Sequence, residues 1–330
     1  MANTLDNITN RSELERLLEA MTSGKSRSIN AEDMMAALND RVKGQEHVTQ
    51  DVVRFIRQEW AKEKRDKPIA SFLFVGPTGT GKTELAKAMT AYLYKDEKAM
   101  LRFDGSELDS AAAKWRLVGA QPGHVSVDQG GQLTRPMFSN PRRLILFDEI
   151  EKACTEILDL FLQIMGDGRL TEQGSGRTAD FTQSIIILTS NQSAEAITKL
   201  QEQVTNPIEL TAAVKAELVA SGRFRPEIAG RIDKICVFKP LSGIVVCDII
   251  AQKMANSAKA YGLELKYIDP RLIMKAYETG QTLKDFGMRE LERQIGLMLN
   301  EHFIAAKEAG FKRVRVDQDD DGEMAITCED

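Results

Sequence analysis

The sequence predicts an α/β fold with a parallel sheet, followed by a smaller, mainly helical domain. Between residues 41 and 238, five short apolar or β-branched runs alternate with helical segments, and strands joined through helices lie parallel. After Lys239-Pro240-Leu241, long helical patterns replace these runs. We therefore expect a large α/β domain at residues 41–238 and a small domain at residues 239–330. The predicted strands are residues 72–75, 100–103, 144–147, 184–188 and 235–238.

The two ends of the chain carry weaker signals. Residues 1–40 hold two short helical patterns, and Asn30 is the expected N-cap of the second. Such a segment is too short for a core of its own, so we expect an N-terminal helical or linker segment. At the other end, residues 313–316 and 323–327 predict a short β-hairpin.

Composition restricts the class of protein. The 330 residues are 42% hydrophobic and 28% charged, which is typical of a globular protein. No apolar run reaches the length of a membrane span, and the N-terminus lacks the apolar region of a signal peptide. We therefore expect a cytoplasmic protein. The net charge of −5 argues against a dominant nucleic-acid surface.

A glycine-rich segment follows the first predicted strand and precedes a helical pattern. It fits G-x-x-x-x-G-K-[ST], in which backbone N–H groups at a helix N-terminus surround a phosphate. We expect Lys82 to reach the β- and γ-phosphates and the Thr83 hydroxyl to bind Mg²⁺. The sequence thus predicts a nucleoside triphosphate site. The segment consists of Gly76, Pro77, Thr78, Gly79, Thr80, Gly81, Lys82 and Thr83.

Polar residues follow two further predicted strands. Asp148 and Glu149 end the third strand, and Asn191 follows the fourth. Ligands of parallel sheets bind at the carboxyl ends of the strands, so these residues should lie near the phosphate segment. We expect Asp148 to hold Mg²⁺, Glu149 to act as the base for the attacking water, and Asn191 to orient that water or contact the γ-phosphate.

Eight motifs in this order and spacing resemble the second ATPase module of Clp-type AAA+ unfoldases and disaggregases. The resemblance extends over roughly residues 40–330. It implies an AAA+ P-loop domain with a five-stranded parallel sheet and a small lid domain, binding ATP and Mg²⁺. The motifs lie at residues 41–45, 76–83, 117–123, 144–153, 167–171, 176–178, 189–191 and 224–233.

The resemblance also assigns roles to individual residues. It implies that Val42 and Gly44 border the adenine, and that Asp148 and Glu149 are the metal acid and the catalytic base. Arg231 matches the arginine finger that reaches the nucleotide of a neighbouring subunit, which implies a homo-oligomeric ring, by analogy a hexamer. Arg289 matches the arginine of the lid domain that contacts the nucleotide.

The sequence departs from the family at the central pore loop. His124 stands where an aromatic residue is expected to grip polypeptide, followed by Val125, and Ser126 replaces a glycine. Residues 192–222 also lack the tripeptide with which protease-coupled relatives dock a peptidase. Ile295-Gly296-Leu297 has that sequence, but we expect it to pack inward from a helix. These features predict a stand-alone module without a peptidase partner.

Three functions therefore remain open from the sequence. The first is an ATP-hydrolysing ring that remodels protein substrates or complexes. The second is an assembly or scaffold protein that binds ATP to control its oligomeric state without threading a substrate, which His124 favours. The third is a nucleic-acid loader, supported by the base-rich residues 54–67.

Overall fold

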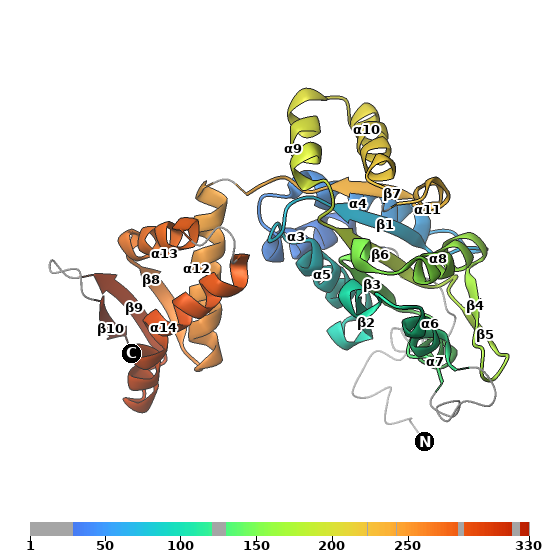
Figure 1. The fold of residues 1–330 in the computed structure, drawn as a ribbon. Coiled ribbons are helices and arrows are strands. Elements are labelled where there is room, and N and C mark those ends of the chain that lie inside the picture. Colours follow the sequence, from blue (N-terminus) through green and yellow to red (C-terminus); the bar gives the residue numbers. More distant parts are fainter. Residues whose placement is uncertain are drawn as a thin grey trace, which may run out of the picture.

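A computed structural model describes residues 29–120, 130–222, 224–241, 243–282, 287–318 and 324–329 of the chain. A five-stranded parallel sheet forms the centre of the larger part, in the order β2-β3-β6-β1-β7 (Figure 1). The predicted five-stranded parallel sheet is therefore confirmed. Its strands are β1 (Ala70–Val75), β2 (Met100–Asp104), β3 (Leu144–Asp148), β6 (Ile185–Ser190) and β7 (Lys234–Val237).

Alternate residues of the central strands enter two separate cores. Phe72 and Phe74 of β1 pack with Met34 and Leu38 on one face, whereas Leu73 of β1 packs on the other face. β1, β3 and β6 are buried along their whole length, which explains why they read as continuous apolar runs. The first core includes helices α3 (Ala31–Arg41), α4 (Glu46–Trp60) and α5 (Lys82–Tyr94).

The opposite core lies between the sheet and the remaining helices of this part, of which α9 and α10 project beyond β7 (Figure 1). Phe161 is fully buried in this core, with its ring centroid 4.6 Å from that of Phe147. A two-stranded antiparallel hairpin that we did not predict follows α8. These elements are α6 (Ala111–Val118), α7 (Thr134–Ser139), α8 (Thr155–Asp167), β4 (Arg169–Thr171), β5 (Thr178–Asp180), α9 (Ala194–Gln203), α10 (Pro207–Ala220) and α11 (Pro226–Arg231).

The C-terminal part has a core of its own, beginning at Ile250 and ending at Val316. The predicted terminal hairpin is confirmed, since β9 and β10 are antiparallel. A third strand that we did not predict, β8, pairs in parallel with β9. The elements are α12 (Gly243–Ala260), β8 (Glu264–Ile268), α13 (Pro270–Thr282), α14 (Gly287–Glu308), β9 (Arg313–Gln318) and β10 (Met324–Glu329). The domain boundaries at residues 40 and 238 remain predictions.

Several smaller expectations can be compared with the structure. The predicted N-cap is confirmed, because the Asn30 side chain accepts hydrogen bonds from the backbone of Glu32 and Asp33. Inward packing of the tripeptide at residues 295–297 is wrong for Leu297, which is 66% exposed although Ile295 is buried. Residues two apart on a helix point about 200° apart, so both cannot face the core. No described helix is long and apolar enough to cross a membrane.

Truncation of Phe161 tests the core on the α8 side of the sheet. Because Phe161 is fully buried, Phe161→Ala should lower the free energy of unfolding by about 3–5 kcal/mol. Urea unfolding followed by circular dichroism measures this loss. Ile208→Ala is the control, since Ile208 is 80% exposed and its truncation should cost less than about 0.5 kcal/mol. Equal losses in the two variants would contradict the described core.

Candidate functional site

A cleft of about 760 Å³ lies at the carboxyl ends of the central strands. One side is formed by the connection between β1 and α5 and by the ends of β3 and β6. The other side includes Ile249, Gln252 and Asn256 of α12. The Gln252 side-chain amide also donates a 2.8 Å hydrogen bond to the carbonyl oxygen of Asp40. The cleft is therefore bordered by residues from both parts of the chain.

The glycine-rich segment forms a closed loop at the start of α5. Gly76 has φ of 139°, and a Cβ at this position would lie 2.5 Å from the carbonyl oxygen of Phe238, so only glycine fits. The Lys82 ammonium donates 2.7 Å hydrogen bonds to the carbonyl oxygens of Gly76 and Pro77. The remaining loop residues that line the cleft are Thr78, Gly79, Thr80, Gly81 and Thr83.

Burial changes the proton affinity of Lys82. Desolvation lowers its pKa from 10.5 to about 8, and the carboxylates of Glu151, Asp148 and Glu149 oppose this shift. Loss of hydration destabilises the charged form, whereas nearby negative charge stabilises it. The ammonium thus lies close to three acidic groups in a region with little water.

The carboxylate of Asp148 receives hydrogen bonds from three elements. The Thr189 hydroxyl donates to Oδ1 at 2.6 Å, and the Thr83 hydroxyl lies 3.2 and 3.1 Å from the two oxygens. The Arg102 guanidinium donates to Oδ2 through Nη2 at 2.8 Å. We predicted the proximity of Thr83 and Asp148, but not the participation of Thr189 and Arg102. Thr189 directly precedes Ser190-Asn191 in the sequence, which could have indicated it.

Glu149 has an unusual backbone conformation. Its φ of 54° is left-handed, a region that non-glycine residues seldom occupy. A Cβ on Gly105 would lie 2.2 Å from the Glu149 carbonyl oxygen, so the glycine gives room for this turn. The Thr189 hydroxyl accepts the Glu149 N–H at 2.9 Å. Lys152 Nζ lies 2.5 Å from Glu149 Oε2. These contacts place the Glu149 side chain at the edge of the cleft.

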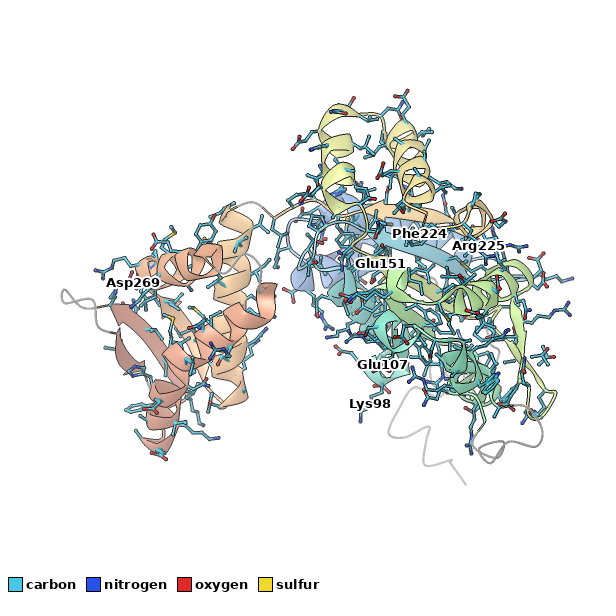
Figure 2. All side chains as sticks on the ribbon, viewed as in Figure 1. Lys98, Glu107, Glu151, Phe224, Arg225 and Asp269 are labelled. Carbon is cyan, nitrogen blue, oxygen red and sulfur yellow. The ribbon has the colours of Figure 1, made fainter. Side chains whose placement is uncertain are left out.

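Asn191 lies beside Glu149. Its Nδ2 is 3.5 Å from Glu149 Oε1, and its backbone N–H donates to Glu151 Oε1 at 3.1 Å. Asn191 Oδ1 and Glu151 Oε2 are buried and have no hydrogen-bond partner among the described residues. Glu151, labelled in Figure 2, was not predicted from the sequence. An unpaired buried oxygen at the cleft is compatible with a ligand that donates to it.

The segment before α4 connects the cleft to the C-terminal part. Val42 lines the cleft, and a Cβ on Gly44 would lie 2.8 Å from Val245 Cγ1 of α12. The buried amide of Gln45 donates to the Lys239 carbonyl oxygen at 2.8 Å and accepts the Lys239 N–H at 3.0 Å. The residues proposed to border the base therefore lie directly against the chain that leads into α12.

Four of the predicted site residues take part in none of the contacts described above. Arg231, at the end of α11, is exposed and does not line the cleft. Its guanidinium lies against Gly166, where an added Cβ would be 1.6 Å from Nη1. Arg289 lies in α14, and its side chain is outside what the structure describes. His124 and Val125 lie outside the described residues.

Comparison with known proteins gives a consistent result. The family model of the AAA domain (Cdc48 subfamily) matches residues 67–235, and a model described as Torsin matches residues 17–100. The chaperone protein ClpB of Corynebacterium efficiens is 40% identical over 308 residues, which are 90% of this chain and 34% of that protein. ClpB of Aquifex aeolicus is 40% identical over 269 residues, 78% of this chain and 26% of that protein.

A third relative is named as a subunit of a protease and not as a chaperone. The ATP-dependent Clp protease ATP-binding subunit ClpA homolog CD4B of Solanum lycopersicum is 35% identical over 314 residues, 89% of this chain and 33% of that protein. The chain thus spans a quarter to a third of the length of these relatives. The AAA match covers more than half of the chain, including the phosphate loop and the acidic end of β3. The chain belongs to the AAA family (Cdc48 subfamily), as a Clp-type AAA+ module.

Proposed function

We propose that the chain binds ATP with Mg²⁺ in this cleft and hydrolyses the ATP. In this proposal the chain is one subunit of a ring that uses ATP hydrolysis to remodel protein substrates. Membership of the AAA family implies nucleotide binding. The main observation in favour of hydrolysis is the placement of Glu149 and Asn191 directly beside the phosphate loop and Asp148. A protein that only binds nucleotide does not need a carboxylate positioned there.

The described residues fit a nucleotide with its metal. The loop offers backbone N–H groups and the Lys82 ammonium to the phosphates, and Thr83 and Asp148 would hold Mg²⁺, which prefers oxygen ligands. No group of three His, Cys, Asp or Glu residues suited to a metal occurs in the described part of the chain. The metal would therefore take its other ligands from phosphates and water. When bound, it neutralises charge on the β- and γ-phosphates.

The remaining residues have roles in positioning and charge stabilisation. Glu149 is the proposed base for the attacking water, and Asn191 orients that water or contacts the γ-phosphate. Val42 and Gly44 would border the adenine. Arg289 would contact the nucleotide from the lid domain, residues 239–330, when that domain closes on the ATPase domain, residues 41–238.

The proposed ring follows from Arg231 and from the relatives. Because Arg231 is exposed and outside its own cleft, it is available to the cleft of a neighbouring subunit, where a guanidinium stabilises the charge of phosphoryl transfer. Two of the relatives are named chaperones, which supports a protein substrate. A hexamer is the proposed assembly, with His124 and Val125 facing its pore.

Substitution of Glu149 tests hydrolysis. Glu149→Gln keeps the size of the side chain but removes the base, so ATP turnover should fall at least about 100-fold while ATP binding persists. A phosphate-release assay and a fluorescent-nucleotide titration measure the two effects. Glu195→Gln, which changes an exposed residue of α9, is the matched control. Unchanged turnover in Glu149→Gln would contradict the proposed function.

The low pKa of Lys82 predicts a pH dependence of binding. Above pH 8 the Lys82 amine of the nucleotide-free protein is mostly neutral. The amine must therefore take up a proton when nucleotide binds, so that the ammonium–phosphate contact can form. Affinity should therefore fall by up to about tenfold per pH unit above pH 8. Nucleotide titrations between about pH 7 and 9.5 cover this range around the lysine pKa.

Two variants control the pH experiment. Lys87 also lines the cleft, but its amine is not in the loop, so Lys87→Gln should keep the slope. Lys82→Arg should remove the slope, because a guanidinium stays charged throughout this range. Wild-type affinity that is constant up to pH 9.5 would exclude Lys82 as the titrating phosphate ligand.

Mixing of two inactive variants tests the trans role of Arg231. Arg231→Ala should lower turnover by about 10³-fold or more. Glu149→Gln subunits retain Arg231, and Arg231→Ala subunits retain Glu149, so mixed rings should regain hydrolysis at shared sites. Phosphate release from the mixture is compared with that from each variant alone. Mixtures no more active than their components, with normal assembly by light scattering, would argue that Arg231 does not act between subunits.

A further inference from the structure

Arg102 is a cation of the cleft that the preceding assignments leave unused. It lies on β2, the edge strand of the sheet. Phe103 is buried in the core on one side of the strand, and side chains alternate between the faces of a strand. Arg102 therefore projects from the opposite face, where it lines the cleft with Asp104 and Asp148.

The Arg102 guanidinium is bound to the proposed metal ligand. Nη2 lies 2.8 Å from Asp148 Oδ2, and the side chains are 39% and 9% exposed, respectively. Asp148 provides the only hydrogen-bond partner of this guanidinium among the described residues. The guanidinium can therefore leave Asp148 without breaking a second described hydrogen bond.

Two cations, Lys82 and Arg102, lie near the carboxylate of Asp148, and only Arg102 has a described hydrogen bond to it. A buried charge is destabilising without a compensating charge or hydrogen bonds. The Thr189 hydroxyl donates to Oδ1 at 2.6 Å, and Arg102 donates to Oδ2. The Thr83 hydroxyl lies 3.2 and 3.1 Å from Oδ1 and Oδ2. The guanidinium thus binds Oδ2, one of the two oxygens beside Thr83 that could bind Mg²⁺.

We propose that Arg102 is an exchangeable counter-ion of the metal site, which neutralises Asp148 without metal and gives up Oδ2 when Mg²⁺ enters with the nucleotide. The proposal rests on the proposed function, because it takes Asp148 as a metal ligand. The two cations cannot occupy the same lone pairs of Oδ2 together. Arg102 therefore sets the Mg²⁺ concentration at which the site becomes loaded, while it protects Asp148 from repulsion by phosphates in the absence of metal.

Arg102→Gln tests this exchange in a binding measurement that does not depend on turnover. A ribose-labelled fluorescent ADP is titrated in chelator and at increasing Mg²⁺. Loss of the competing cation should lower the half-saturating Mg²⁺ concentration by about fivefold, and loss of the counter-ion should weaken binding in chelator by a similar factor. The variant should therefore load Mg²⁺ more easily but bind the labelled ADP more weakly in chelator. A general distortion of the cleft would worsen both properties.

Two further variants control for charge and folding. Arg102→Lys keeps the positive charge, so its half-saturating Mg²⁺ concentration should be near that of the wild type. Arg116→Gln removes an arginine of similar exposure that pairs with Glu107, labelled in Figure 2, outside the cleft. It should leave both measurements unchanged. Melting temperatures establish that each variant is folded.

The results separate this proposal from the proposed function. An Arg102→Gln variant whose half-saturating Mg²⁺ concentration is unchanged or raised would overturn the exchange, and so would a lysine variant that matches the glutamine variant. If wild type hydrolyses ATP and Glu149→Gln does not, the proposed function stands whichever of these results is found. Wild-type protein that binds labelled ADP with no effect of Mg²⁺ would overturn the exchange as well.

Discussion

The geometry of the cleft depends on the compensation of one buried charge, that of Asp148. Its carboxylate lies at the end of the inner strand β3, where apolar residues cover both faces of the sheet. Thr83 of α5, Thr189 of β6 and Arg102 of β2 all donate to it. A buried carboxylate is costly without such donors. The same contacts that stabilise Asp148 also connect β3 to the start of α5 and to its two neighbouring strands.

The sequence predicted those parts of the site that depend on residues close to one another in the chain. The glycine-rich loop has a fixed spacing, and strands buried on both faces read as continuous apolar runs. Arg102 and Gly105 could not be found in this way, because their partners Asp148 and Glu149 lie more than 40 residues away in sequence. β8 was missed because its exposed face carries Glu264 and Lys266, which weakens the strand signal.

The tight turn at Glu149 shows how the same constraint extends to the side chain proposed as the base. Its left-handed backbone costs free energy relative to an extended strand end, and the hydrogen bond from its N–H to Thr189 helps to offset that cost. Thr189 therefore binds both Asp148 and Glu149 through one hydroxyl. A shift of β6 relative to β3 would disturb the Asp148 carboxylate and the Glu149 backbone at once, which favours rigid movement of this side of the cleft.

The other side of the cleft is attached by different contacts, and this asymmetry determines what can move. The Gln45 amide holds the backbone of Lys239 with two hydrogen bonds, and Gly44 leaves room for Val245. Beyond these contacts, the Gln252 side chain of α12 donates a hydrogen bond to the carbonyl oxygen of Asp40. A rotation of α12 about Lys239 would thus break this exposed hydrogen bond but preserve the buried Gln45 pair. Nucleotide that contacts Val42 on one side and α12 on the other would bias that rotation, because it gains contacts with α12 only when the cleft is closed.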